Sequence, residues 1–284
     1  MSQLNPRQQE AMQYVSGPLL VLAGAGSGKT SVITRKIAYL IEECQMPAER
    51  ITAVTFTNKA AREMKARVQK LLPSDKTKGL TVSTFHQFGL QFLRYELLHT
   101  PLKGNFSIMD AEDSKRLLMD LMVRDNMSGA ESRELVGKAI KMISDWKNDL
   151  VPPEKAADTL TDPEDMLFAT LYQLYERNLR AYNAVDFDDL IVMPTRLLQE
   201  NTQVRDKWQN RIRYLLVDEY QDTNTAQYEL IKLLVGVQPR FTVVGDDDQS
   251  IYAWRGAKPE NMALLQEDFP KLKVVKLEQN YRST

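Results

Sequence analysis

The sequence has almost no cysteine and no long apolar run. Cys44 is the single cysteine among 284 residues, so the chain cannot form an internal disulfide, and a reducing compartment is favoured. No apolar stretch approaches the length of a membrane span, and the first residues lack the charged-then-apolar pattern of a secretion signal. The composition therefore predicts a cytoplasmic protein that does not bind a membrane.

An excess of either charge is also absent. The 37 Lys and Arg residues are balanced by 38 Asp and Glu residues, which gives a formal net charge of −1. No global basic field exists, so any nucleic-acid site must be a local groove. The hydrophobic fraction of 43% is ordinary for a soluble globular protein, and the length suits one large domain or two smaller ones.

Short apolar runs predict buried strands. They are nearly continuous in Val, Ile and Leu, which is typical of strands covered on both faces. Helical spacing follows several of them, as in residues 60–72 and 225–234. This alternation predicts an α/β fold with a doubly wound parallel sheet, whose sites lie at the carboxyl ends of the strands. The runs are residues 18–24, 51–56, 80–85, 214–219, 241–246 and 273–278.

One section lacks this alternation. Between residues 89 and 198 no convincing strand pattern occurs, while residues 110–125 and 166–182 have helical spacing. We therefore expect an all-helical subdomain at 89–198. It would be inserted into a sheet domain formed by residues 1–88 and 199–276.

The segment AGAGSGKT follows the first predicted strand and precedes a helical pattern, as a phosphate-binding P-loop does. Gly26 and Gly28 let the backbone curl so that its N–H groups face phosphate oxygens, and the helix dipole assists. Lys29 can reach the β- and γ-phosphates, and Thr30 can hold Mg²⁺. Ala23 is the one departure from the P-loop pattern, which usually begins with Gly. The alternative is a chance glycine-rich turn. The predicted phosphate-binding residues are Ala23, Gly24, Ala25, Gly26, Ser27, Gly28, Lys29 and Thr30.

Two adjacent carboxylates, Asp218 and Glu219, follow another predicted strand in the run LLVDEYQD. Buried carboxylates are costly unless they have a partner or a function. Asp218 can hold Mg²⁺, and Glu219 can orient or deprotonate an attacking water. The alternative is a pair that merely begins an exposed loop. Together with the P-loop, the pair indicates hydrolysis of a nucleoside triphosphate.

The stretch TVVGDDDQSIYAWRGA, residues 242–257, combines two kinds of side chain. Carboxylates and Gln249 stand at one end, while Tyr252 and Trp254 with Arg255 stand at the other. Such a loop can contact a charged ligand and stacked planar groups at once. The alternative is a surface turn whose aromatic side chains fold back into a core.

In this order, the motifs resemble the N-terminal half of a superfamily 1 UvrD/Rep/PcrA-type ATP-dependent DNA helicase. The resemblance covers residue 4 to the last residue, and the combination of motifs is highly specific. The motifs are LNPRQ (4–8), AGAGSGKT (23–30), TFTNKAA (55–61), STFH (83–86), DFDDL (186–190), LLVDEYQDTN (215–224), VVGDDDQSIYAWRGA (243–257) and LEQNYRS (277–283).

The resemblance implies a RecA-like motor domain that uses ATP and Mg²⁺. By this resemblance Gln8 reads the adenine and Tyr281 stacks on it, while Glu219 activates water. The residues implied at the γ-phosphate are Gln249, Arg255 and Arg282, and those implied at Mg²⁺ are Thr30 and Asp218. One departure is Ser31, where relatives often carry Arg.

The same resemblance implies a path for single-stranded DNA. The residues implied along it are Phe56, Thr57, Asn58, His86, Phe187, Tyr252 and Trp254. Alternatives remain for two of them, because His86 can be a capping or packing residue and Phe187 can belong to the core. Base stacking on aromatic side chains tolerates any sequence, which suits a motor that moves along DNA.

The resemblance implies a 3′-to-5′ translocase that unwinds 3′-tailed duplexes, with partners in replication or repair. Residues 277–284 would begin a second motor domain, so we expect this chain to bind its ligands but to unwind DNA weakly or not at all. The first alternative is the motor arm of a helicase–nuclease complex. The second is a non-catalytic DNA- or partner-binding fragment.

Overall fold

The computed structural model describes residues 3–24, 28–124, 131–246 and 260–277, with backbone alone at 131–132. The chain divides into two compact units, which we call the sheet unit and the insertion unit. The sheet unit comprises Met1–Phe88, Asn201–Asn224 and Tyr228–Thr284, and the insertion unit comprises Gly89–Glu200 and Thr225–Gln227.

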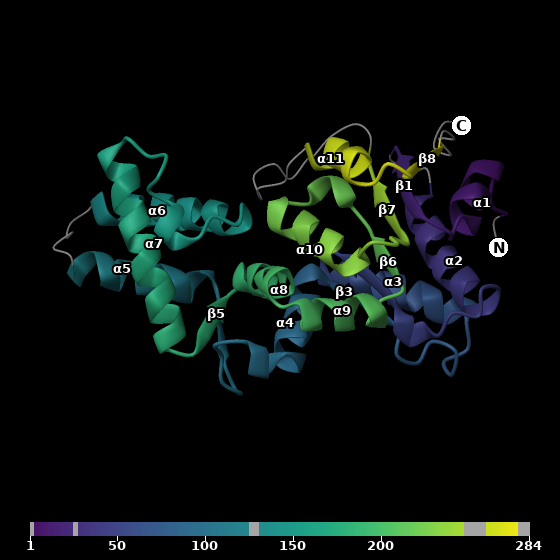
Figure 1. Ribbon diagram of the computed structural model, residues 1–284, viewed down its shortest axis with the longest axis horizontal. Coiled ribbons are helices and arrows are strands. Elements are labelled where there is room, and N and C mark those ends of the chain that lie inside the picture. The colour runs from purple at the N-terminus through teal and green to yellow at the C-terminus, as the bar shows by residue number, and fades with distance from the viewer. Residues whose placement is uncertain (1–2, 25–27, 125–130, 247–259, 278–284) are drawn as a thin grey trace. The chain divides into compact units, whose positions relative to one another are not determined.

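Within the described residues, the sheet unit is built on a six-stranded sheet with the order β3-β2-β6-β7-β1-β8 (Figure 1). Every pairing between neighbouring strands is parallel. Each predicted apolar run contains one of these strands, so the expected parallel α/β sheet is confirmed. The strands are β1 (Pro18–Ala23), β2 (Ile51–Thr55), β3 (Thr81–Thr84), β6 (Tyr214–Val217), β7 (Phe241–Gly245) and β8 (Lys273–Leu277).

Helices cover both faces of this sheet. On one face, α1, α2 and α3 share a buried apolar cluster with alternate strand residues, such as Leu19 and Val21 of β1. On the other side lie α10 (Thr225–Val235) and α11 (Figure 1). Coverage of both faces explains why the strands are continuously apolar. The helices of this unit are α1 (Pro6–Gln13), α2 (Lys29–Glu42), α3 (Asn58–Leu71), α9 (Thr202–Arg211) and α11 (Glu260–Asp268), with the 3₁₀ turns η1 (Ala48–Arg50) and η4 (Tyr220–Asp222).

Two helices continue from one unit into the other. Helix α4 (Phe85–Tyr95) begins in the sheet unit, and α10 (Thr225–Val235) begins in the insertion unit. At the far end of the described chain, Leu277 is the last residue of β8 and pairs with Ala23 of β1. Leu277 therefore lies in the first sheet, although the sequence assigns it to the beginning of a second domain.

The insertion unit is mostly helical. Its core joins apolar side chains such as Leu118, Val136 and Phe168, which come from three different helices. Its helices are α5 (Ala111–Arg124), α6 (Glu131–Asn148), α7 (Pro163–Ala181) and α8 (Asp189–Glu200), with the 3₁₀ turns η2 (Leu97–His99) and η3 (Pro153–Lys155).

The expectation of an all-helical insertion is wrong in one respect. Strands β4 (Ser107–Met109) and β5 (Ala184–Asp186) pair in parallel within it. Each has three residues, which is too short to produce a periodic pattern in the sequence.

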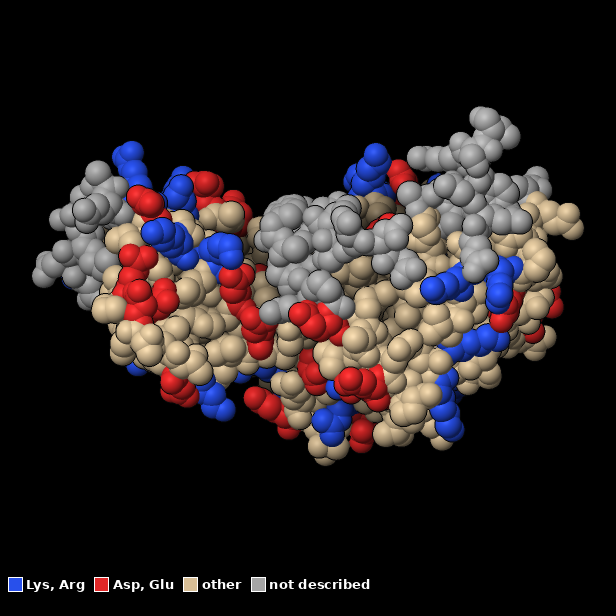
Figure 2. Space-filling model, turned by 90° about the horizontal axis from the view of Figure 1, so that it is seen from above, with Lys and Arg blue, Asp and Glu red and all other residues tan. Residues whose placement is uncertain are grey.

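Charged side chains of both signs occur on the face shown in Figure 2, over each unit. This agrees with the net charge of −1. None of the helices in the described ranges is both long and apolar enough to cross a membrane.

Candidate nucleotide and nucleic-acid site

The strand order brings three chemically important segments together at the carboxyl edge of the sheet. Strands β6, β7 and β1 are consecutive neighbours, so the residues that follow them lie side by side. Lys29 follows β1, Asp246 follows β7 and Asp218 follows β6. The Lys29 ammonium lies 3.9 Å from the Asp246 carboxylate. Its charge also acts to lower the pKa of Asp218.

The end of the P-loop has a backbone that favours glycine. Gly28 has a φ of 80° and directly precedes helix α2, which begins at Lys29 with Thr30 in its first turn. A Cβ atom at Gly28 would lie 2.5 Å from Gln8 Nε2. The left-handed backbone conformation therefore favours glycine here, and a larger residue would also displace the Gln8 amide. Ala23 ends β1 and Gly24 follows it, whereas Ala25, Gly26 and Ser27 lie outside the described residues.

Gln8 is held in place by the beginning of helix α1. The Gln8 N–H donates to Asn5 Oδ1 at 2.8 Å, and the Asn5 N–H donates to Gln8 Oε1 at 3.0 Å. This reciprocal pair is a capping box, and it leaves the Gln8 amino group facing Gly28. The structure thus brings Gln8 beside the P-loop. Sequence reasoning assigned no role to Asn5, although the spacing of Asn5 and Gln8 is the signal of such a box.

A buried lysine joins α1 to α2. Lys36 is 0% exposed, and its ammonium donates to the carbonyl oxygens of Ala11, at 2.8 Å, and Tyr14. These carbonyls belong to the C-terminal end of α1, where backbone acceptors lack helical partners. Burial lowers the pKa of Lys36 to about 7. Lys36 thereby fixes the helix that carries Gln8 to the helix that carries Lys29, a contact that no sequence motif indicated.

The two carboxylates after β6 differ in environment. Asp218 is 7% exposed, and burial followed by the charge of Glu219 raises its pKa to about 6. The Glu219 N–H donates to Asp218 Oδ1 at 2.9 Å. Glu219 has a φ of 53° and a ψ of 42°, the left-handed conformation that non-glycine residues rarely adopt. Strained backbone of this kind is often found at functional sites.

These residues fit a divalent cation and a triphosphate. Asp218 is buried and Glu219 is half-buried beside it, and the burial of Asp218 together with the charge of Glu219 raises the pKa of Asp218. A bound Mg²⁺ prefers oxygen ligands, and the Asp218 carboxylate and Thr30 hydroxyl are of that kind. When bound, the cation would supply the missing positive charge.

A buried glutamine beside these carboxylates was missed. Gln221, 6% exposed, donates from Nε2 to Glu219 Oε2 at 2.6 Å. Its Oε1 accepts a hydrogen bond from the Asp246 N–H at 2.9 Å. The only sequence signal was its position two residues after Glu219. That position alone does not indicate a role.

A second group of predicted residues follows β2 and β3 at the same edge of the sheet. The rings of Phe56 and Phe85 have centroids 5.2 Å apart and are tilted by 51°. Thr57 is exposed and caps α3 by accepting from the Ala60 N–H at 3.1 Å. Asn58 is exposed in the first turn of that helix. A half-buried aromatic ring therefore adjoins an exposed helix N-terminus.

Two predicted residues had alternatives that the structure addresses. His86 does not cap α4, because Thr84 Oγ1 accepts the hydrogen bond from the Gln87 N–H at 3.0 Å. Burial lowers the pKa of His86, which favours a neutral imidazole. Phe187 is 49% exposed and lies in the turn after β5, so it is not a core residue. Phe187 belongs to the insertion unit, and its predicted contact with DNA stays a prediction.

Other predicted site residues lie outside the described part of the chain. They are Gln249, Tyr252, Trp254, Arg255, Tyr281 and Arg282.

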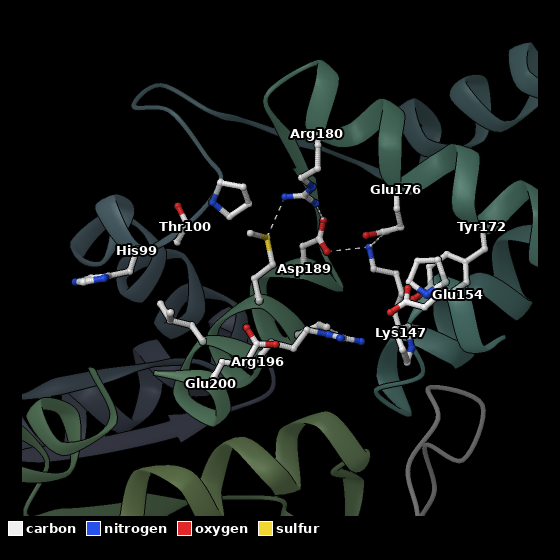
Figure 3. Close-up of a pocket in the computed structure, with 16 residues that line it drawn as sticks. His99, Thr100, Lys147, Glu154, Tyr172, Glu176, Arg180, Asp189, Arg196 and Glu200 are labelled. Atoms are coloured by element: carbon white, nitrogen blue, oxygen red, sulfur yellow. Dashed lines mark hydrogen bonds and ion pairs between the residues drawn. The ribbon is translucent and has the colours of Figure 1, made fainter. Parts of the chain in front are cut away.

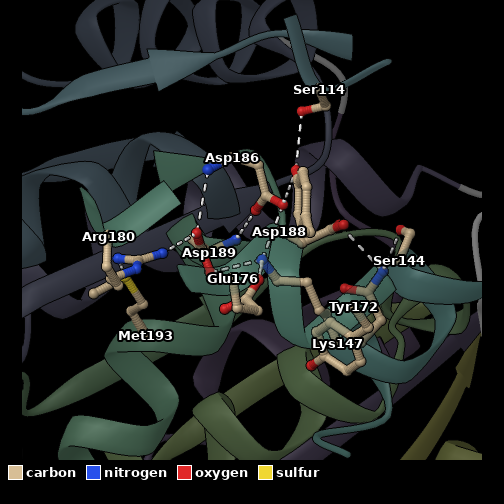
Figure 4. Close-up of polar contacts among 12 residues, drawn as sticks. Ser114, Ser144, Lys147, Tyr172, Glu176, Arg180, Asp186, Asp188, Asp189 and Met193 are labelled. Atoms are coloured by element: carbon tan, nitrogen blue, oxygen red, sulfur yellow. Dashed lines mark hydrogen bonds and ion pairs between the residues drawn. The ribbon is translucent and has the colours of Figure 1, made fainter. Parts of the chain in front are cut away.

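The insertion unit contains a cluster of carboxylates with the spacing of a metal site. Oxygens of Glu176, Asp186 and Asp189 lie within 4.8 Å of one another. The Lys147 ammonium lies among them, 2.6 Å from Glu176 and 2.9 Å from each aspartate (Figure 4). Burial acts to lower the pKa of Lys147, but the three carboxylates outweigh it and raise that pKa well above its usual value. The lysine is thus the cation of this cluster.

A pocket of about 340 Å³ lies beside this cluster within the insertion unit (Figure 3). Lys147, Glu176, Arg180 and Asp189 are among the residues that line it. Arg180 is paired with Asp189 at 2.6 Å, and Lys147 with Glu176. Much of its polar lining is therefore already committed to internal ion pairs.

Comparison with known proteins agrees with the geometry of the sheet unit. Residues 4–270 match the model of the UvrD/REP helicase N-terminal domain. The chain is 57% identical over 284 residues to ATP-dependent DNA helicase Rep of Escherichia coli (strain K12), covering 99% of this chain and 41% of that protein. It is 43% identical over 286 residues to ATP-dependent DNA helicase PcrA of Staphylococcus aureus (strain Mu50), covering 100% of this chain and 38% of that protein. The chain therefore spans well under half the length of these relatives.

Proposed function

The chain belongs to the UvrD/REP helicase family, and we propose that it is the ATP- and DNA-binding part of a 3′-to-5′ ATP-dependent DNA helicase. The observation that carries the proposal is that the ends of three neighbouring strands lie side by side at one edge of the sheet. Lys29, Asp218 and Asp246 come from β1, β6 and β7, which are neighbours in the sheet. A P-loop lysine near a buried aspartate at a strand end, with a second carboxylate next to it, is the arrangement that phosphoryl-transfer enzymes use.

Each residue of this site has a distinct role in the proposal. Lys29 binds the β- and γ-phosphates and neutralises their charge. Thr30 and Asp218 hold Mg²⁺, which supplies electrostatic stabilisation when bound. Glu219 orients an attacking water and accepts its proton. Gln8, whose amino group faces Gly28, binds the base.

The proposed DNA path follows the ends of β2 and β3. Phe56 offers a ring for base stacking, while the exposed Thr57 and Asn58 can contact a phosphate at the N-terminus of α3. A neutral His86 can accept or donate a hydrogen bond without adding charge. The nucleotide and DNA contacts then share one edge of one sheet.

The ATP site is tested by steady-state hydrolysis with and without single-stranded DNA, together with titration of a fluorescent ATP analogue. Lys29→Ala should remove both binding and turnover, because its ammonium is the P-loop cation. Glu219→Gln should bind Mg·ATP normally and hydrolyse it slowly. Matched controls are the exposed substitutions Lys70→Ala and Glu267→Gln. If Glu219→Gln hydrolyses ATP as fast as the parent, Glu219 does not activate the attacking water.

The DNA path is tested by affinity for fluorescent oligonucleotides. Phe56→Ala should weaken single-strand binding by about 1–3 kcal/mol, which is the range for one base–aromatic stack. Affinity should fall as salt rises, because phosphate contacts release counterions. Equal affinity for single strands and duplexes, unchanged in Phe56→Ala, would exclude this path. A protein that binds DNA without hydrolysing ATP would instead favour the non-catalytic alternative.

A further inference from the structure

Gln221 connects the ends of two neighbouring strands through a single side chain. It is the central residue of η4, which follows β6. The donor end of its amide binds the Glu219 carboxylate at 2.6 Å, and the acceptor end binds the Asp246 N–H at 2.9 Å. No other hydrogen bond in the described residues links the Glu219 carboxylate to the segment that follows β7.

The orientation of this amide is determined by its partners. A backbone N–H can only donate, so the group that faces the Asp246 N–H must be the oxygen Oε1. The amino group Nε2 is then directed at Glu219 Oε2, which accepts its hydrogen bond. A flipped amide would place two donors together at one end and two acceptors together at the other.

The turn that carries Gln221 is held by helix α11. Asn261, 3% exposed, donates from Nδ2 to the carbonyl oxygens of Thr223 at 3.0 Å and Asn224 at 3.2 Å. Tyr220 Oη in turn donates to the Asn261 carbonyl at 2.9 Å. The backbone on both sides of Gln221 is therefore fixed.

Space around the amide is also limited. A Cβ atom at Gly245 would lie only 3.2 Å from Gln221 Oε1. Strand β7 thus passes close to the side chain, which is buried as well. A glutamine confined in this way can restrain the carboxylate to which it donates.

We propose that Gln221 is a positioning residue for ATP hydrolysis, which holds the Glu219 carboxylate in the orientation that accepts a proton from the attacking water. The proposal rests on the proposed function, because it assigns Gln221 a role only through Glu219. The hydrogen bond from Nε2 occupies Glu219 Oε2 and leaves Oε1 for the water.

Two substitutions separate the donor end of the amide from its acceptor end. Gln221→Met preserves length and apolar volume but removes both hydrogen bonds. Gln221→Glu keeps an oxygen for the Asp246 N–H but replaces the donor by a carboxylate that repels Glu219. Both should lower kcat for ATP roughly 10- to 100-fold, the range for losing a hydrogen bond to a charged group. KM for ATP and the affinity for a fluorescent ADP analogue should stay within about twofold of the parent, since Lys29 is untouched.

A double substitution distinguishes positioning from a merely structural effect. In a Glu219→Gln background, Gln221→Met should cause no further loss of kcat, because the group that it orients is already gone. Independent effects on the fold would multiply instead. The matched control is Gln209→Met, which removes a hydrogen bond of 2.8 Å to the Leu233 carbonyl elsewhere in the sheet unit and should leave kcat unchanged.

All measurements use the whole chain of residues 1–284, and the parent is assayed first. A parent without ATPase activity would contradict the proposed function rather than the role of Gln221. An active parent with normal kcat in Gln221→Met and Gln221→Glu would overturn the positioning role. Normal kcat in Gln221→Glu alone would also overturn it, because the acceptor end of the amide would then be sufficient. The same holds if the two substitutions in the double variant lower kcat by the product of their separate effects.

Discussion

Among the described residues each unit buries one lysine, but the groups around the two ammoniums differ in kind. Lys36 in the sheet unit binds two neutral carbonyls, and Lys147 in the insertion unit binds three carboxylates. Both are at most 1% exposed, and each ammonium lies 5.5 Å from the centroid of a tyrosine ring. The pKa of Lys36 is lowered to about 7, whereas that of Lys147 is raised well above its usual value. Equal burial thus produces opposite shifts.

The difference shows that partners, rather than depth, decide the charge of a buried lysine. Burial disfavours the ammonium at both positions. Around Lys147 the carboxylates reverse this effect, and their own charges depend on the lysine in return. The two carbonyls around Lys36 can be satisfied by a neutral amine, which still has two N–H donors. The insertion unit therefore depends on an ion network, and the α1–α2 junction depends on hydrogen bonds.

The largest expected effect is the loss of Lys147. Lys147→Met should destabilise the insertion unit by about 3–5 kcal/mol, because it leaves buried carboxylates without their cation. Hydrogen exchange read separately over the two units should show the loss in α6, α7 and α8. The control Lys141→Met removes an exposed pair with Asp145 in the same helix and should cost within about 0.5 kcal/mol. Similar stabilities of Lys147→Met and Lys141→Met would contradict the claim that the ion pairs of Lys147 stabilise the insertion unit.

Loss of Lys36 should cost less. Lys36→Met should destabilise the α1–α2 junction by about 1–3 kcal/mol, since the carbonyls of Ala11 and Tyr14 lose their donor. Faster hydrogen exchange should be confined to α1 and the beginning of α2. Affinity for an ATP analogue should also fall, because α1 carries Gln8. If hydrogen exchange in α1 becomes faster but the affinity for the ATP analogue is unchanged, Gln8 does not contribute to nucleotide binding.

A divalent cation should replace Lys147 but not Lys36. In Lys147→Ala, the oxygens of Glu176, Asp186 and Asp189 have lost the ammonium and gained space, and Ca²⁺ takes such oxygen ligands. Free Ca²⁺ at ten times its Kd should restore roughly 1.4 kcal/mol. Thermal unfolding with Ca²⁺ or a chelator measures this. Lys36→Ala should not respond, and equal responses would mean that Ca²⁺ acts elsewhere.

The smallest effect is a pH dependence specific to Lys36. Its pKa is about 7 in the folded state, below the ordinary lysine value of 10.5, so the unfolded chain binds more protons between these values. Stability should therefore rise with pH in this window, by up to about 1.4 kcal/mol per unit. Urea unfolding of the parent and Lys36→Met at pH 7 and above gives the difference. If the free energy of unfolding depends on pH equally in the parent and in Lys36→Met, Lys36 stays charged in the folded state. Lys147 should contribute no such rise, since its pKa is raised.

Local patterns were enough to predict the sheet and the P-loop. The strands β1, β2, β3, β6, β7 and β8 were found because apolar runs and helical spacing are properties of adjacent residues. Strands β4 and β5 were missed because three residues carry no period. Asp218 was expected in the nucleotide site from its position after a predicted strand, and Gln8 through the family resemblance. The structure brings Gln8 close to Gly28 and Asp218 within the influence of the Lys29 charge.

The sequence by itself determined the six strands of the main sheet, several of the helices that pack on it and the motifs that follow the strands. Tertiary structure alone decided that β6, β7 and β1 are neighbours, so that Gln221 reaches Asp246, 25 positions away. It also decided that Lys147 meets Glu176 and Asp186, which are 29 and 39 positions away. Hydrogen bonds and ion pairs of this kind depend on distance in space and on exclusion of water. Distance in space and exclusion of water produce no repeating pattern in the sequence, so the sequence does not reveal them.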